Sequence, residues 1–169
     1  SIRHFQANMA AVKLLGRWGY IDKGEHLVVQ PHFEEAFPFR GKLALVRKDG
    51  HYGMVNRKGD AVIPAEYSRI VPAQNNRYKL FSTKLVSGKE TPQVGLASES
   101  GVVLIHSKYD SLKDLGNGYV VVSRKGRFGL LTLNGRSTIP LKHDQIIYDS
   151  FNDVYLALEK PAWQSIDLP

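Results

Sequence analysis

The residues best suited to acid–base or metal chemistry are six histidines and one pair of adjacent glutamates. The histidines lack the short spacings of metal sites and are expected to be exposed or hydrogen-bonded; they are His4, His26, His32, His51, His106 and His143. Glu34 and Glu35 are neighbours, so on an extended strand their carboxylates would face opposite ways and could not act as a pair. These residues predict no catalytic site, no metal site and no cofactor.

Other catalytic chemistries are excluded by residue type. The chain contains no Cys, which excludes disulfides, Cys-ligated zinc and thiol catalysis. It contains neither a Gly-x-Ser-x-Gly nucleophile elbow nor a phosphate-binding loop, because Gly116-Asn117-Gly118 lacks the final Gly and reads as a turn. We therefore expect a protein that is not an enzyme.

Most of the chain consists of degraded copies of one stretch, Gly16-Arg17-Trp18-Gly19-Tyr20-Ile21-Asp22. Closer copies begin at Gly50 and Gly126, and weaker ones begin at Pro92 and Pro161. The predicted units are 1–15 (partial), 16–49, 50–91, 92–125, 126–160 and 161–169 (partial), which form a single domain. Because the chain opens and closes inside a unit, we expect it to be part of a longer protein. Such repeats indicate a stacked scaffold.

Each unit reads as short β-strands separated by turns. In the first unit, strands are predicted at residues 18–22, 27–29 and 43–46, and Pro31 is expected to end the second of them. Pro64 has the same place in the next unit. No apolar stripe with a 3.6-residue period and helical length occurs. The strand pattern predicts an all-β fold.

Certain positions recur in register and are interpreted as packing positions. They are the aromatic residues Trp18, Tyr52 and Phe128, the glycines that follow or match them, Gly19, Gly53, Gly95 and Gly129, and the residues 14 positions later, Phe33, Tyr67, Tyr109 and His143. Three positions further on, an apolar residue recurs as Ala36, Ile70, Leu112 and Ile146. We expect these side chains to be buried, because a structural position repeats whereas a ligand site need not.

The units predict a tandem array of about four to five antiparallel three-stranded units, open and β-solenoid-like, because about three strands cannot bury a face alone. A small β-propeller closed by the two termini is the alternative, since the chain begins on the last strand of one unit and ends on the first strand of another.

The third unit is eight residues longer than its neighbours, because Gly53 and Gly95 are 42 residues apart, against 34 between Gly95 and Gly129. The extra residues are placed in a connecting loop at 82–92, and insertions in repeat scaffolds often map to the binding face. The candidate binding residues are Lys84, Ser87, Lys89, Glu90 and Thr91. Aromatic residues outside the register are the candidate surface rings: Phe39, Tyr78, Tyr119 and Tyr148.

The chain has 169 residues and a net charge of +7, with a pI near 9.6. Its cations are scattered, which is typical of charge that maintains solubility, although the sign favours acidic partners. No apolar run approaches the roughly 20 residues of a membrane-spanning helix, so no transmembrane segment is predicted.

The repeated residues resemble the bacterial WG-repeat family, also called KWG repeats. Trp18-Gly19-Tyr20-Ile21-Asp22, Pro31 and Phe33 match its unit closely, and Tyr52-Gly53, Pro64 and Tyr67 follow it. Departures are Tyr52 and Phe128 in place of Trp, Val94 in place of an aromatic residue, and Gln164 in place of Gly. The resemblance implies a β-rich, non-catalytic repeat module of bacterial proteins, which are often envelope-associated or multidomain. It leaves both cytoplasm and cell envelope open.

The function expected from these observations is a non-enzymatic binding or scaffold module that mediates protein–protein interaction. The alternative is binding of an anionic or cell-envelope polysaccharide through a basic, aromatic-bearing surface. Nucleic acid is not an expected partner, because the cations form no block of like charge.

Overall fold

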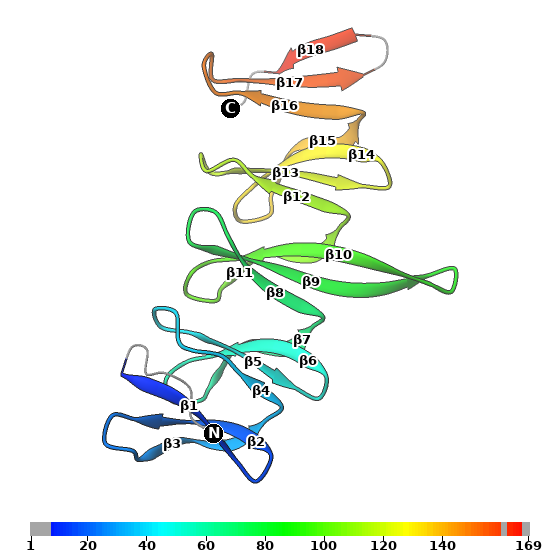
Figure 1. Cartoon of the computed structure of the whole chain (residues 1–169). Helices are drawn as coiled ribbons and strands as arrows, with labels where there is room; N and C mark the ends of the chain where they lie inside the picture. Colours follow the sequence, from blue (N-terminus) through cyan, green and yellow to red (C-terminus); the bar gives the residue numbers. More distant parts are fainter. Residues whose placement is uncertain (1–7, 160–161, 167–169) are drawn as a thin grey trace.

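The computed structural model describes residues 8–159 and 162–166, and every regular element in these ranges is a β-strand. The strands form five antiparallel sheets, which follow one another along the molecule as a stack (Figure 1). His4 and the ends of the first and last predicted units lie outside the described residues. Among the described residues, no helix could span a membrane.

The strands have the following bounds. The first sheet contains β1 (Met9–Leu14), β2 (Arg17–Asp22) and β3 (Leu27–Phe33). The second contains β4 (Glu35–Ala36), β5 (Ala44–Lys48), β6 (His51–Val55) and β7 (Ala61–Tyr67), and the third contains β8 (Arg69–Ala73), β9 (Arg77–Val86), β10 (Lys89–Ala97) and β11 (Val103–Tyr109). The fourth contains β12 (Ser111–Asp114), β13 (Tyr119–Arg124), β14 (Arg127–Thr132) and β15 (Ser137–His143), and the fifth contains β16 (Gln145–Asp149), β17 (Val154–Glu159) and β18 (Ala162–Ile166).

The open all-β array is confirmed. The closed propeller is wrong, because β1 and β18 lie at opposite ends of the stack (Figure 1). The two end sheets have three strands each, whereas the three interior sheets have four. The fourth strand is the short segment that follows each recurring aromatic residue, as β4 follows Phe33. This segment pairs with the next sheet, so each unit carries the chain from one sheet to the following one.

The hydrophobic core lies between successive sheets. Trp18, Tyr20 and Phe33 of the first sheet pack against Ala36 and Phe39, which belong to the second sheet and its first connection. The later junctions repeat the arrangement: Met54 and Ile63 with Ile70 and Leu80, Leu96 and Ile105 with Leu112 and Val122, and Leu130 and Ile139 with Ile146 and Ala157. Ala36, Ile70, Leu112 and Ile146 are buried as predicted, and so are Trp18, Phe33, Tyr67, Tyr109 and His143. The predicted burial of Tyr52 and Phe128 is wrong, because both side chains are only half-buried. Each sheet is therefore stabilised through its neighbours.

The glycine of the Trp-Gly step faces a bulge in the next strand. Trp18 pairs with Phe33 and Tyr20 pairs with Val29, so three residues of β3 lie opposite Gly19. The same irregularity lies opposite Gly53, Gly95 and Gly129. The bulge brings the β3 backbone so close that a Cβ on Gly19 would lie 2.9 Å from the Pro31 nitrogen. This position therefore requires glycine for close backbone approach.

Pro31 and Pro64 do not end their strands, which corrects the expectation from the sequence. Both lie inside strands that continue to the recurring aromatic residue, β3 to Phe33 and β7 to Tyr67. The prolines occupy the bulged segments, where the ladder is interrupted. A missing N–H costs little at such a position.

Candidate interaction site

The predicted loop at 82–92 is a β-hairpin arm formed by the outer halves of β9 and β10. The two strands pair continuously from Ser82 opposite Gln93 to Val86 opposite Lys89. Ser87 and Gly88 close the arm with φ values of 51° and 75°, as in a two-residue type I′ turn. The arm extends beyond the other sheets on one side of the stack (Figure 1).

The register explains where the eight extra residues lie. In the first sheet, Leu14 pairs with Arg17 around the turn Leu15-Gly16. In the third sheet, the corresponding turn is Ser87-Gly88, so Gly88, rather than Pro92, matches the first glycine of the repeat. Four residues are thus added to each strand, and the insertion lengthens the hairpin without adding a loop.

Both outer edges of the arm are unpaired, and they differ in the backbone donors that they offer. The neighbours β8 and β11 pair with β9 and β10 only up to Phe81 and Val94, respectively. The Phe81 carbonyl points to the outer side of β9, because it accepts from the Ser68 N–H at 2.8 Å. Backbone groups of an antiparallel strand point to the same side at every second residue, so those of Thr83 and Leu85 also point outward. On the β10 side, Pro92 has no N–H to offer. The outer edge of β9 therefore keeps its backbone donors and is the better edge for pairing.

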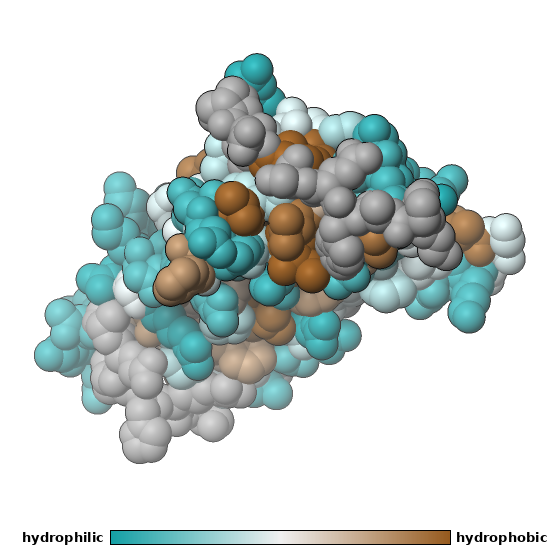
Figure 2. All heavy atoms as spheres, turned by 90° about the horizontal axis from the view of Figure 1, so that it is seen from above, coloured by the Kyte–Doolittle hydropathy of each residue, from teal (hydrophilic) through white to brown (hydrophobic). Residues whose placement is uncertain are grey.

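The tip of the arm combines apolar and charged side chains. Leu85 is 69% exposed and Val86 is 50% exposed. The predicted residues Lys84, Ser87, Lys89 and Glu90 are also exposed, and Thr91 is half-buried. Hydrophobic spheres stand beside hydrophilic ones on the side to which the arm projects (Figure 2). The sequence reasoning missed Leu85 and Val86, although two apolar residues inside an insertion could have indicated them.

Two of the four predicted surface aromatic residues are buried, which corrects that prediction. Phe39 is 2% exposed and Tyr78 is 9% exposed. Phe39 packs edge-on against Tyr20 across the first junction, with ring centroids 4.9 Å apart. Tyr78 alternates with the buried Leu80 on β9, so both side chains enter the second junction. Neither ring is therefore exposed on the outer surface.

The other two rings, Tyr119 and Tyr148, are half-buried and pack on Tyr155 at the last junction. Tyr155 lies 4.9 Å from Tyr148 and 5.6 Å from Tyr119 between ring centroids. Asn117 donates to the Tyr155 hydroxyl at 2.7 Å. A hydrogen bond to Asp153 raises the pKa of Tyr148, and burial raises that of Tyr155. The cluster serves mainly to join the fourth and fifth sheets.

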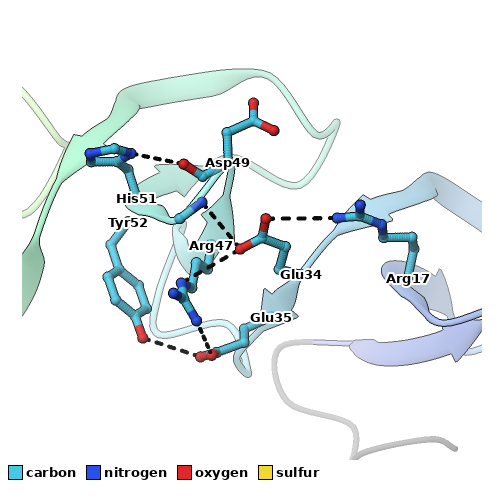
Figure 3. Close-up of polar contacts among 8 residues, drawn as sticks. Arg17, Glu34, Glu35, Arg47, Asp49, His51 and Tyr52 are labelled. Carbon is cyan, nitrogen blue, oxygen red and sulfur yellow. Dashed lines mark hydrogen bonds and ion pairs between the residues drawn. The ribbon is translucent and has the colours of Figure 1, made fainter.

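Glu34 and Glu35 converge on one arginine, contrary to the expectation that they face opposite ways. Arg47 Nη1 contacts Glu35 at 3.1 Å and Arg47 Nε contacts Glu34 at 3.5 Å (Figure 3). Glu34 occupies the bend between β3 and β4, where the strand alternation does not hold. The Tyr52 hydroxyl donates to Glu35 at 3.2 Å. Burial is the main cause that raises the pKa of Tyr52, and the negative charge of Glu35 is the second. The carboxylates are satisfied by protein groups.

Acidic residues at three of the bends between sheets contact groups of an adjacent hairpin. Glu34 accepts from the Gly50 N–H at 3.2 Å and lies 3.9 Å from Arg17 (Figure 3). Asp110 accepts from the Lys125 N–H at 2.6 Å, and Asp144 pairs with Arg127 at 2.6 Å. The acidic residue after the recurring aromatic therefore has a structural role.

The described histidines form no metal centre. His26 lies 3.3 Å from Asp22, while His32 and His51 contact the carbonyls of Gln30 and Asp49. His143 is buried and lies 3.2 Å from Glu159. Within residues 8–159 and 162–166, no group of three or more His, Asp or Glu side chains could hold a metal ion. The arm therefore remains the candidate interaction site.

Comparison with known proteins identifies the repeats. Residues 18–51 and 52–79 each match the family described as WG containing repeat, which confirms the resemblance over two adjacent units. No curated protein matches the chain.

Two solved structures are similar at low identity. One is described as a eukaryotic initiation factor, with 12% identity, a TM-score of 0.43, and coverage of 98% of this chain and 50% of that chain. The other is the extracellular domain of a putative hybrid two-component system from B. thetaiotaomicron, with 9% identity, a TM-score of 0.37, and coverage of 92% and 25%. The present chain thus spans half or less of these structures.

Proposed function

Because two adjacent units of this chain are WG repeats, we propose that it is a non-enzymatic binding module that holds another protein, with the β9–β10 arm as its main contact. The observation that carries the proposal is the open edge of β9 beside the exposed Leu85 and Val86. An extended segment of the partner adds a strand along this edge, so that backbone hydrogen bonds supply affinity and the apolar tip supplies specificity.

The charge of the arm supports an acidic partner segment. Lys84 and Lys89 are exposed, and among the described residues neither forms an ion pair. The whole chain carries a net charge of +7. Pairing of the full open edge with a second copy would place Lys84 opposite its own counterpart, a like-charge pair that opposes such association. The partner is therefore a different protein.

A stacking surface for anionic polysaccharide has less support. Phe39 and Tyr78 are buried, and Tyr119 and Tyr148 pack on Tyr155. Cations cover other rings, as Arg69 covers Phe81 at 4.2 Å from the ring centroid. We therefore favour protein over glycan as the ligand class.

Shortening the arm tests the proposal. Deletion of residues 83–86 and 89–92 leaves Ser87-Gly88 to connect Ser82 with Gln93, which reproduces the tight turns of the other hairpins. Affinity capture from cells that encode the chain, followed by measurement of the dissociation constant for each purified captured protein, compares this variant with the full chain. We expect at least a tenfold loss of affinity, weaker binding of the full chain at higher salt, and a similar loss in Leu85→Ser/Val86→Ser.

A matched variant controls for general apolar exposure. Leu27 and Val28 are 36% and 43% exposed but lie on the first sheet, so Leu27→Ser/Val28→Ser should retain the captured proteins. Equal affinity of every captured protein for the full chain and the shortened arm would overturn the proposal. Capture of anionic glycan alone, or of a second copy of the chain alone, would do the same.

A further inference from the structure

One position is occupied differently at each junction of the stack. One residue of this position lies three places before the residue that pairs with the repeat glycine, as Leu43 lies three places before Val46, the partner of Gly53. The other residue lies on the next sheet, two places after the buried apolar position, as Pro72 follows Ile70. Successive junctions pair Met9 with Pro38, Leu43 with Pro72, Arg77 with Asp114, and Tyr119 with Tyr148.

At the two later junctions this position is filled. Arg77 forms an ion pair with Asp114, which is also bonded to Asn75 at 3.1 Å. Tyr119 and Tyr148 pack on Tyr155. At the junction of the second and third sheets, the smaller Leu43 and Pro72 leave a hollow of about 250 Å³.

The hollow is apolar inside and charged at its mouth. Its lining includes Phe37, Leu45, Met54, Ile70 and Tyr78 together with Leu43 and Pro72. Met54 is 3% exposed and Ile70 is 5% exposed, so the hollow reaches the core. An apolar cavity of ~150 Å³ is enough to bind benzene. The hollow therefore has room for one aromatic side chain.

Arg40 lies at the mouth of this hollow and is exposed. In the described part of the chain, no carboxylate lies within ion-pair distance of its guanidinium. Glu99 and Arg77 line an adjoining depression with Arg40 and Tyr78, and Arg77 is neutralised by Asp114. Burial raises the pKa of Tyr78, and the negative charge of Glu99 raises it further, whereas the positive charge of Arg40 lowers it. The charges of Glu99 and Arg40 are therefore both felt at the Tyr78 hydroxyl.

We propose that this hollow binds an aromatic side chain of a partner protein, and that an acidic residue next to it in the partner pairs with Arg40. The complementarity of an apolar pocket and an unpaired guanidinium selects an acidic-aromatic peptide segment. The site lies at the start of β9 and the arm lies at its end, so this second contact extends the proposed function and does not depend on the arm.

Short peptides test the site directly. The probe is acetyl-Gly-Glu-Phe-Gly-amide, with Gln in place of Glu and Ala in place of Phe as matched controls, and the readout is the methyl NMR signals of Met54 and Ile70. We expect saturable shifts with a dissociation constant in the millimolar range, about threefold weaker binding of the Gln peptide, and no shift with the Ala peptide.

Substitutions show whether the peptides bind in the hollow or on another surface. Arg40→Gln should abolish the preference for Glu over Gln, Glu99→Gln should strengthen binding of the Glu peptide, and Lys42→Gln, an exposed cation in the same connection, should change neither. Pro72→Tyr fills the hollow and should abolish the shifts.

Three outcomes would overturn the proposal: no methyl shift at roughly 10 mM peptide, equal affinity for the Glu and Gln peptides, or unchanged binding in Pro72→Tyr. The shortened-arm variant should bind these peptides normally. The proposal for the hollow can therefore be refuted while the arm binds its partner, and the proposal for the arm can be refuted while the hollow binds peptide.

Discussion

A Cβ atom on Gly19 would lie 2.3 Å from the carbonyl oxygen of Val29 on the next strand. The corresponding distances from Gly53 to Ile63, Gly95 to Ile105 and Gly129 to Ile139 are 2.6, 2.4 and 2.8 Å. Such contacts are with the backbone, which cannot rotate away as a side chain can. The second residue of the Trp-Gly step is therefore fixed by strand packing.

Gly53→Ala should destabilise the fold by about 3 kcal/mol or more, because the added methyl group forces two strands apart. Gly50→Ala is the matched control: its φ is +77° and no atom lies within 4 Å of the added Cβ, so we expect a loss of about 1 kcal/mol from backbone strain alone. Urea unfolding of the two variants checks the difference. Equal losses would refute the close-approach explanation.

Trp18→Ala should lower the free energy of unfolding by about 3 kcal/mol, as a large-to-small change in a packed core does. Trp18 is 9% exposed and pairs with Phe33 across β2 and β3. Binding through the arm should be unchanged, because the arm belongs to the third sheet. Leu27→Ala, at a 36% exposed position, should cost less than about 0.5 kcal/mol. Thermal stability of Trp18→Ala equal to that of the native chain would contradict the prediction.

Asp114→Ala should cost about 3 kcal/mol, since it leaves the guanidinium of Arg77 buried without its partner. The two side chains are 17% and 5% exposed for Arg77 and Asp114, respectively. The double variant Arg77→Leu/Asp114→Pro copies the apolar pair Leu43 and Pro72 and should be more stable than Asp114→Ala. A double-mutant cycle by denaturant unfolding, with Arg77→Leu and Asp114→Pro as the single variants, gives the coupling energy. Absence of coupling would show that the ion pair does not stabilise this junction.

Stability should fall as pH rises from about 10 to about 12. Burial, reinforced by Glu66, raises the pKa of Tyr67 from 10.0 to about 12. The folded state therefore holds this proton more tightly than the unfolded state, so the contribution is complete below pH 10 and is lost as pH rises through the folded value. Tyr67→Phe should show a smaller loss in this range, measured by urea unfolding at a series of pH values. Identical slopes for the two proteins would rule out Tyr67 as a source.

The repeat pattern predicts short strands, a tandem array and the buried positions at Ala36, Ile70, Leu112 and Ile146, whereas it leaves an open array and a closed propeller as alternatives. It worked because these residues depend on local alternation and on a spacing that each unit repeats. The bulges were not predictable in this way. Pro31 usually marks a strand end in a sequence, and only the pairing of Trp18 with Phe33 and Tyr20 with Val29 reveals that the strand continues.

The sequence predicts the insertion but not its conformation. The unequal spacing identified the insertion, whereas a spacing count cannot tell a loop from a longer hairpin, and the turn glycine Gly88 was passed over for Pro92. Tyr78 could have been recognised as buried, since it lies two residues from Leu80 on the same strand face. Phe39 gave no such signal, because its burial depends on Tyr20 of the preceding sheet. The hollow beside Arg40 likewise depends on contacts between units.

The changing pair at the junctions has a consequence for assembly of the chain. Identical repeats can dock in the wrong sequence, a common cause of misfolding in tandem arrays. Here, the guanidinium of Arg77 is paired with Asp114 of the following sheet, and the ring of Tyr119 packs on Tyr155 of the following sheet. A sheet that docked on a non-adjacent neighbour would leave Arg77 or Asp114 without its partner, so the unlike junctions disfavour docking out of order.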